Sequence, residues 1–151
     1  MSFTIIRCIT IGKFSLFCHL LNFISSYNTS LMVKFDLETG DYLHEQLPNA
    51  LFGNQAPYQP SAFTDFDFAI DEEGLWVIYS TVENTLDIVV SKIDPNTLDV
   101  LATFKTNWRK KWAGNAFMAC GVLYVLKKVS FTCFRLLIQD KFSSMRKNTR
   151  R

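Results

Sequence analysis

Short β-rich runs separated by turn residues dominate the middle of the sequence and constrain the fold most. Four of them, at residues 66–70, 75–80, 88–93 and 100–104, are rich in β-branched and aromatic residues and recur at about 8–12-residue spacing. Asp, Asn, Gly and Pro occur in the short connections, and these residues favour β-turns. No segment between residues 31 and 127 shows a helical hydrophobic period. The sequence therefore predicts an all-β fold in the form of an antiparallel meander.

Further runs flank this central series. Residues 32–37 and 42–47 enclose a Gly-containing turn, and residues 121–126 form one more strand-like run. Residues 48–62 hold three of the four prolines and little periodicity, so they are expected to form a loop. Four strands of this kind make one propeller blade, whereas about seven make a sandwich. Periodicity alone leaves both architectures open.

Charge divides the chain into three segments. The net charge of +2 combines a weakly basic start at residues 1–30, a net charge of −6 over residues 31–127 and a net charge of +6 over residues 128–151. Such breaks in composition indicate segments of different origin rather than one uniform domain.

The N-terminal segment has the outline of a weak signal sequence. Arg7 and Lys13 precede an apolar stretch, and residues 14–33 contain no Lys, Arg, Asp or Glu. Several polar residues dilute this stretch, and it lacks a clear cleavage site of small residues. It is too polar for a membrane-spanning helix, so no transmembrane segment is expected. A secretion signal and a loosely packed stray segment both remain open.

The C-terminal segment is basic. Residues 129–138 fit either a strand or an amphipathic helix, and residues 145–151 form a short polar tail. A cationic tail can bind nucleic acid, but this one lacks interleaved aromatic residues and belongs to no nucleic-acid-binding module. We therefore expect no nucleic-acid partner.

The cysteines and histidines do not form a recognisable metal or redox motif. No C-x-x-C pair is present, which argues against a zinc site and a dithiol redox centre. The two histidines, His19 and His44, lie far apart in sequence, so a histidine-based catalytic or metal site is not expected. The four cysteines are Cys8, Cys18, Cys120 and Cys133.

Three blocks of sequence carry a family resemblance. They are TDFDFAIDEEGLWVIYST at residues 64–81, IVVSKIDPNTLDVLATF at residues 88–104 and AGNAFMACGVLYVL at residues 113–126. In this order and spacing they resemble the olfactomedin domain, and MVKFDLETGDYLHEQLPNA at residues 32–50 fits the strand and turn before them. The resemblance covers residues 27–127 and is nearest to gliomedin-like and olfactomedin-like secreted proteins.

The resemblance implies a five-bladed β-propeller with calcium in its central channel. Such domains are extracellular, in the matrix or at cell surfaces, where they bind other proteins, and they are not known as enzymes. Residues 27–127 would form a partial olfactomedin domain of about two blades. Residues 1–26 and 128–151 would be irregular, non-family ends. The expected partners are thus extracellular or cell-surface proteins, and the chain is interpreted as a fragment.

The resemblance also implies a set of calcium ligands. Asp67 matches a carboxylate ligand that faces the channel, Asn115 an amide oxygen ligand and Ala116 a backbone carbonyl ligand. Calcium takes about six to eight oxygens, so these residues make an incomplete half-site, and calcium is expected to be lost or weakly bound. Asp65 lies on the same strand face as Asp67. Its role, as an edge carboxylate or as a support for the ligands, stays open.

Two further residues are candidates for covalent modification, Cys120 from the resemblance and Asn28 from a local sequon. Cys120 matches a family cysteine that forms a disulfide with a cysteine at the start of the propeller, but that partner is absent here. Cys120 is therefore expected to be free and buried. Asn28, Thr29 and Ser30 form an N-x-S/T sequon, so Asn28 is a candidate glycosylation site in a secreted product.

Three functions compete. The leading interpretation is a fragment of an extracellular olfactomedin-type protein–protein interaction module, non-catalytic and not necessarily functional alone. An enzyme would use Asp65 and Asp67 as a general acid and base, but the sequence has no accompanying cleft signature. The alternative is a small membrane-surface protein that uses its apolar N-terminus and basic C-terminus as anchors.

Overall fold

The computed structural model describes residues 21–25, 29–58, 64–130 and 133–141, with side chains described for residues 29–58 and 64–127. Within these residues the regular structure is almost entirely β. The strands are β1 (Leu21–Ser25), β2 (Leu31–Asp36), β3 (Tyr42–Gln46), β4 (Asp67–Asp71), β5 (Gly74–Ser80), β6 (Asp87–Ile93), β7 (Val100–Arg109), β8 (Ala113–Ala119), β9 (Val122–Ser130) and β10 (Cys133–Lys141), and a single 3₁₀ turn, η1 (Lys110–Trp112), separates β7 from β8.

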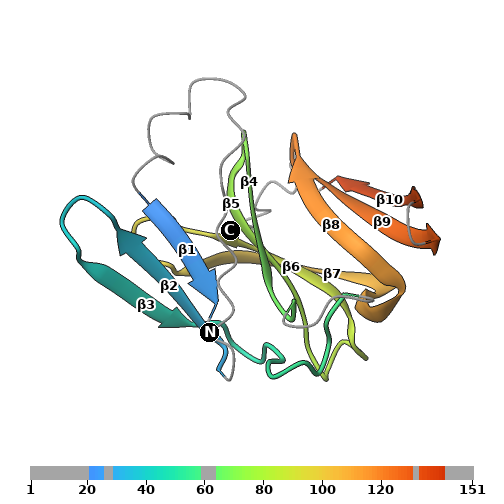
Figure 1. Cartoon of the computed structure of the whole chain (residues 1–151), viewed down its shortest axis with the longest axis horizontal. Helices are drawn as coiled ribbons and strands as arrows, with labels where there is room; N and C mark the ends of the chain where they lie inside the picture. The colour runs from blue at the N-terminus through green and yellow to red at the C-terminus, as the bar shows by residue number, and fades with distance from the viewer. Residues whose placement is uncertain (1–20, 26–28, 59–63, 131–132, 142–151) are drawn as a thin grey trace, which may run out of the picture.

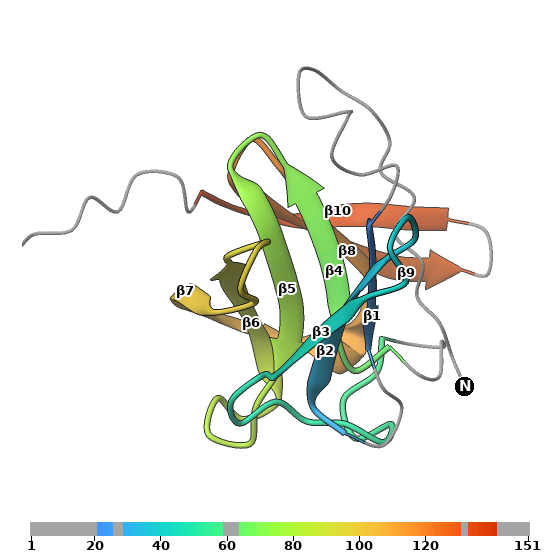
Figure 2. The same cartoon turned by 90° about the vertical axis from the view of Figure 1, so that its left-hand side faces the viewer.

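The strands form three antiparallel sheets in which sequential strands are neighbours. Strands β1 to β3 form the first, β4 to β7 the second and β8 to β10 the third. Figure 1 shows the four-stranded sheet between the other two. Figure 2 views the molecule from the side of the first sheet, with β2 and β3 in front of β4. The prediction of an all-β antiparallel meander is confirmed, because short connections join each strand to the next.

The two middle strands of the central sheet, β5 and β6, are buried on both faces. Successive side chains of a strand point to opposite faces, and in β5 they alternate between two separate hydrophobic clusters. Leu75, Val77 and Tyr79 enter the first cluster, while Trp76 and Ile78 enter the second. A strand buried in this way has an almost uninterrupted apolar sequence, as residues 75–79 do.

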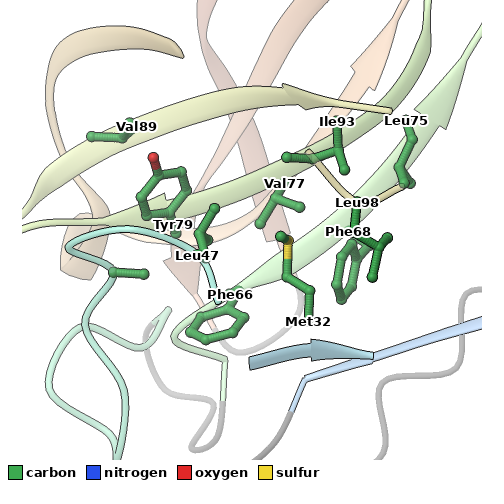
Figure 3. Close-up of a cluster of buried hydrophobic side chains, with 11 residues drawn as sticks. Met32, Leu47, Phe66, Phe68, Leu75, Val77, Tyr79, Val89, Ile93 and Leu98 are labelled. Carbon is green, nitrogen blue, oxygen red and sulfur yellow. The ribbon is translucent and has the colours of Figure 1, made fainter. Parts of the chain in front are cut away.

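The first cluster joins the first sheet to the central one. Met32 of β2 reaches toward Val77 and Phe68, and Leu47 from the segment after β3 lies beside Tyr79 (Figure 3). The second cluster joins the opposite face of the central sheet to the third sheet. It contains Trp76 and Ile78 of β5 together with Ala116 of β8 and Leu123 of β9. The three sheets therefore pack face to face through two cores.

The sequence predicts Trp76, Tyr79 and Phe117 in buried layers, and the structure confirms the first two. Trp76 and Tyr79 are buried, whereas Phe117 is 43% exposed. The prediction for Phe117 is wrong because this side chain lies on the face of β8 opposite the buried Ala116 and Met118. Phe117 stacks instead on Tyr124 of β9, with ring centroids 5.1 Å apart.

The strands extend beyond the segment that carries the resemblance. β1 and β10 lie in segments for which irregular structure is expected, and β9 continues to Ser130. Each added strand pairs with its sequence neighbour, β1 with β2 and β10 with β9. Pairing satisfies backbone N–H and C=O groups that an edge strand would otherwise leave open, which accounts for the longer β-structure.

Candidate functional site

Asp67 begins β4 and faces the second core. Its neighbours Phe66 and Phe68 belong to the first cluster, so the period of two turns Asp67 and Ala69 to the opposite face, where Ala69 packs against the second cluster. The register pairs Asp67 with Ile78, a member of that cluster. The register of β4 therefore directs the Asp67 side chain inward, toward the second cluster.

The surroundings of Asp67 disfavour its charge. Its side chain is half-buried, and enough protein surrounds it that burial raises the pKa of the carboxyl to about 6. The positive charge of Lys110 and a hydrogen bond from the Phe68 N–H lower this pKa and only partly oppose the effect of burial. A carboxylate in this position gains from a further positive charge or from additional hydrogen-bond donors.

Lys110 is the most deeply buried charged residue near Asp67. Its exposed fraction is 0%, and its Nζ donates to the carbonyl oxygens of Ala56 at 3.0 Å and Asp65 at 2.9 Å, and also to that of Thr64. The ammonium lies 4.1 Å from the ring centroid of Tyr58. Burial lowers the pKa of Lys110 to about 7, against the charges of Asp65 and Asp67, which raise it.

Asp65 is neither an edge carboxylate nor a support for the predicted ligands, the two roles that the sequence left open. Its buried carboxylate accepts hydrogen bonds from the N–H groups of Asn54 at 2.6 Å and Ala56 at 2.7 Å. Together with the hydrogen bond that its carbonyl oxygen accepts from Lys110, these contacts fold the segment before residue 58 against the start of β4. Asp65 therefore organises the loop that borders the site.

Tyr58 completes the inner wall of the site. Its backbone N–H donates to Thr64 Oγ1 at 2.8 Å, and its side chain is buried in the second cluster. The hydroxyl oxygen is buried, with no hydrogen-bond partner among the residues that the structure describes. Burial, and then the charge of Asp67, raises the pKa of the phenol well above its usual value, so Tyr58 keeps its proton and remains a potential donor.

Asn115 and Ala116 lie on β8, next to β4. These strands contact each other although they belong to different sheets. A bulge between Ala113 and Asn115 shifts the register of β8, and Ala116 is buried in the second cluster with Tyr58. Asn115 is exposed, and its Oδ1 accepts a hydrogen bond from the Ala116 N–H at 2.8 Å.

The structure thus brings together the strands that carry the three predicted ligands, while the ligand set itself stays a prediction. In the described part of the chain, no three His, Cys, Asp or Glu side chains form a group that could hold a metal ion. Two observations nevertheless fit an oxygen-preferring cation: a half-buried carboxylate with a raised pKa, and an unpartnered buried hydroxyl in the cluster that also holds Ala116. The ammonium of Lys110 disfavours a bound cation, because it already supplies one positive charge that acts on Asp67.

Cys120 occupies the tight turn between β8 and β9 and is free, but it is exposed, so the expectation of a buried thiol is wrong. Cys120 and Gly121 both have positive φ, 52° and 68°, as in a two-residue hairpin turn that points away from the core. The Cys120 N–H donates to Glu72 at 3.0 Å, and the charge of Glu72 raises the pKa of the thiol. The glycosylation candidate Asn28 lies outside the described residues.

Sequence reasoning missed Lys110 and Tyr58. Lys110 is part of a basic run, Arg109 to Lys111, in which nothing in the sequence singles out one residue. The η1 turn directs Lys110 inward while Lys111 is exposed. The only local signal is the shortness of the connection between β7 and β8, which favours a tight turn but does not say which side chain it buries.

Comparisons with known proteins support the resemblance carried by the three sequence blocks. The family model described as "Olfactomedin-like domain" matches residues 17–148. The chain belongs to the olfactomedin-like domain family. The matched range is wider than the predicted 27–127 and includes β1 and β10.

Two curated relatives show similar identity to this olfactomedin-like chain. Olfactomedin-4 of Homo sapiens is 44% identical over 109 residues, which are 72% of this chain and 21% of that protein. Adhesion G protein-coupled receptor L1 of Mus musculus is 44% identical over 108 residues, 71% of this chain and 7% of the receptor. The match therefore spans only a small part of each relative. No helix within the described residues has the length and apolar composition needed to cross a bilayer.

Proposed function

We propose that this chain acts as part of an extracellular protein–protein interaction module of the olfactomedin type, without catalytic activity of its own. The observation that carries the proposal is the family match over residues 17–148. Face-to-face packing of small sheets also supports it, because such stacks present loops and strand edges as binding surfaces. The expected partners are extracellular or cell-surface proteins.

The geometry around the acidic pair favours binding over catalysis. Each carboxylate oxygen of Asp65 accepts a backbone N–H, and Asp65 is buried. A general acid or base must reach a substrate, and Asp65 is committed to holding its loop. A glycosidase-like role for the pair therefore lacks support.

Calcium binding at Asp67 is the second part of the proposal. The Asp67 carboxylate, Asn115 Oδ1 and the Ala116 carbonyl would hold the ion, which would supply positive charge and tie β4 to β8. Since calcium takes about six to eight oxygens and these residues offer about three, water would complete the set and the dissociation constant would be no tighter than about millimolar. Thermal melts of the full chain in increasing calcium test this, because a ligand of the folded state raises Tm.

Secretion and glycosylation test the proposed location. A tagged full chain expressed in cultured secretory cells is expected in the medium, with Asn28 carrying an N-linked glycan. Enzymatic removal of N-glycans should then lower the apparent mass of the secreted chain, while the Asn28→Gln variant should show no change. A chain that stays inside the cell would contradict an extracellular role.

Binding to intact cells distinguishes the proposed function from the membrane-surface alternative. The labelled full chain is expected to bind intact cultured cells saturably, and prior treatment of those cells with trypsin should abolish the binding. If binding survives trypsin and the chain also sediments with acidic liposomes, the membrane-surface function is correct instead. Absence of saturable binding to either target would contradict both.

A further inference from the structure

The hydroxyl of Tyr58 is one of two buried side-chain polar atoms that lack a hydrogen-bond partner among the described residues, the other being Trp108 Nε1. The side chain is held on several sides: its backbone N–H bonds to Thr64 Oγ1 at 2.8 Å, Lys110 Nζ lies 4.1 Å from its ring, and the second core surrounds it. The ring therefore cannot easily rotate its hydroxyl to solvent. Yet that hydroxyl is buried without a protein partner in the described part of the chain.

A second buried tyrosine shows the usual arrangement. Tyr79 lies on the opposite face of the central sheet, and its hydroxyl shares a hydrogen bond with Ser91 Oγ at 3.0 Å. Burying a hydroxyl without a partner lowers stability, so such an atom in a packed core calls for an explanation. A phenylalanine would fill the space of Tyr58 without that loss.

Neighbouring groups limit where the partner of the Tyr58 hydroxyl can lie. Tyr58 shares the second cluster with the predicted ligand Ala116, and Asp67 pairs with Ile78 of the same cluster. Lys110 can only donate and cannot accept from Tyr58. The predicted ligands Asp67, Asn115 and Ala116 leave a cation short of oxygens, and water has to fill the remaining positions. A protonated phenol beside such water has an acceptor for its hydrogen.

We propose that Tyr58 is a further member of the Asp67 site, and that its hydroxyl donates a hydrogen bond to a water ligand of the bound cation. The inference rests on the proposed calcium site. It explains why a tyrosine and not a phenylalanine lines this part of the core: the hydroxyl is unfavourable in the free protein and becomes favourable when the cation and its water are present.

The proposal predicts opposite effects of Tyr58→Phe with and without calcium. In a chelator, the variant is expected to melt at or above the temperature of the unmodified chain, because it removes an unpartnered buried hydroxyl. In calcium, the Tm of the variant should rise less than that of the unmodified chain. Calcium binding should weaken by about tenfold, the lower end of the range for loss of an outer-shell hydrogen bond. Both melts use the full chain, with calcium from about 0.1 mM to about 50 mM to cover weak sites.

Tyr79→Phe is the matched control, because it removes a buried hydroxyl that has a partner. It is expected to lower Tm with and without calcium and to leave the calcium-dependent gain unchanged. Circular dichroism checks that each variant keeps its β-structure. Terbium luminescence, excited through the aromatic side chains, gives a second measure of cation binding that does not depend on the melt.

The outcomes distinguish a failure of the Tyr58 role from a failure of the proposed calcium site. If the unmodified chain gains Tm in calcium and Tyr58→Phe gains the same amount, the calcium site stands and the role of Tyr58 is overturned. If the unmodified chain shows neither a calcium-dependent gain nor terbium luminescence, the calcium site is wrong and the role of Tyr58 fails with it. A reduced gain together with an unchanged or higher Tm in chelator supports the inference.

Discussion

At the scale of the residue, one buried ammonium connects backbone groups from distant parts of the chain. The carbonyl oxygens that Lys110 Nζ contacts belong to residues 45 to 54 positions earlier, and all lie at the loop that precedes β4. A Lys side chain reaches so far inside a protein only when acceptors replace its water. The closure of this loop therefore depends on Lys110.

Replacing Lys110 by Met should destabilise the chain strongly. The thioether fills a similar volume but leaves three carbonyl oxygens without their donor and removes the charge beside Asp67. We expect a loss of about 3 kcal/mol or more in the free energy of unfolding, measured by urea denaturation. The neighbouring Lys111, which is exposed, provides the control: Lys111→Met should change stability by less than about 0.5 kcal/mol. Equal losses in the two variants would contradict the role of Lys110.

The raised pKa of Asp67 predicts a pH dependence of stability. The folded protein holds a proton on Asp67 up to a pKa of about 6, whereas the ordinary pKa of an aspartate carboxyl is 3.8. Folding is therefore favoured by this group at low pH, and that contribution is lost as the pH rises from about 4 to about 6. The loss amounts to at most about 3 kcal/mol, and less where solvent reaches the side chain.

Asp67→Asn removes this titration and should flatten the stability profile between pH 4 and pH 6 in calcium-free buffer. Thermal melts at several pH values measure it, and Asp41→Asn, at an exposed position, is the control that should leave the profile unchanged. If Asp67→Asn retained the same decline, the stability change would have to come from another group.

The candidate site could be predicted only in part. The inward direction of Asp67 follows from the alternation of apolar residues around it, because period two is a local property. Lys110 and Tyr58 come from a turn and a loop, and their meeting depends on long-range packing that no local pattern records. The same applies to Asp65, whose two N–H donors lie in a loop nine and eleven residues away.

At the scale of the element, the acidic turn after β4 holds the hairpin turn between β8 and β9. Asp71 Oδ2 accepts the Gly121 N–H at 2.7 Å, and Glu72 accepts the Cys120 N–H at 3.0 Å. The other oxygen of Asp71 accepts the indole N–H of Trp76 at 2.7 Å. One carboxylate therefore links a buried indole of the central sheet to a turn of the third sheet.

Asp71→Ala should cost about 2 kcal/mol of stability, because it leaves the buried Trp76 indole N–H without its acceptor and releases the Gly121 turn. Chemical denaturation followed by tryptophan fluorescence measures the loss. Glu73→Ala is the control in the same turn: Glu73 is exposed and lies 3.8 Å from Lys92, so its removal should cost less than about 1 kcal/mol. A larger loss for Glu73 would contradict this assignment.

Most strands could be predicted because their apolar runs and turn residues are local signals. Strands β4 to β7 overlap the predicted runs. β10 could not be predicted, since residues 129–138 fit a helix as well as a strand and only pairing with β9 distinguishes them. The burial of Phe117 cannot be predicted, because the sequence pattern of β8 does not reveal that only one face of this strand is covered.

At the scale of the whole molecule, the position of the central sheet predicts an order of stability. β5 is buried on both faces, whereas every side chain of β3 is exposed. Native-state hydrogen exchange of the full chain should therefore show the slowest amides in β5 and β6, opening only with global unfolding, and faster exchange in β3 through local opening. Protection of β3 equal to that of β5 would contradict this order.

The burial of β5 on both faces also has an evolutionary consequence. Each position of β5 from Leu75 to Tyr79 belongs to one of the two clusters, so a substitution anywhere along it disturbs a core. In a library of random variants selected for folding, β5 should tolerate few changes at consecutive positions, while β3 should accept many. Sequence divergence among descendants of this chain would then concentrate in its outer strands, where new binding specificities can arise without loss of the fold.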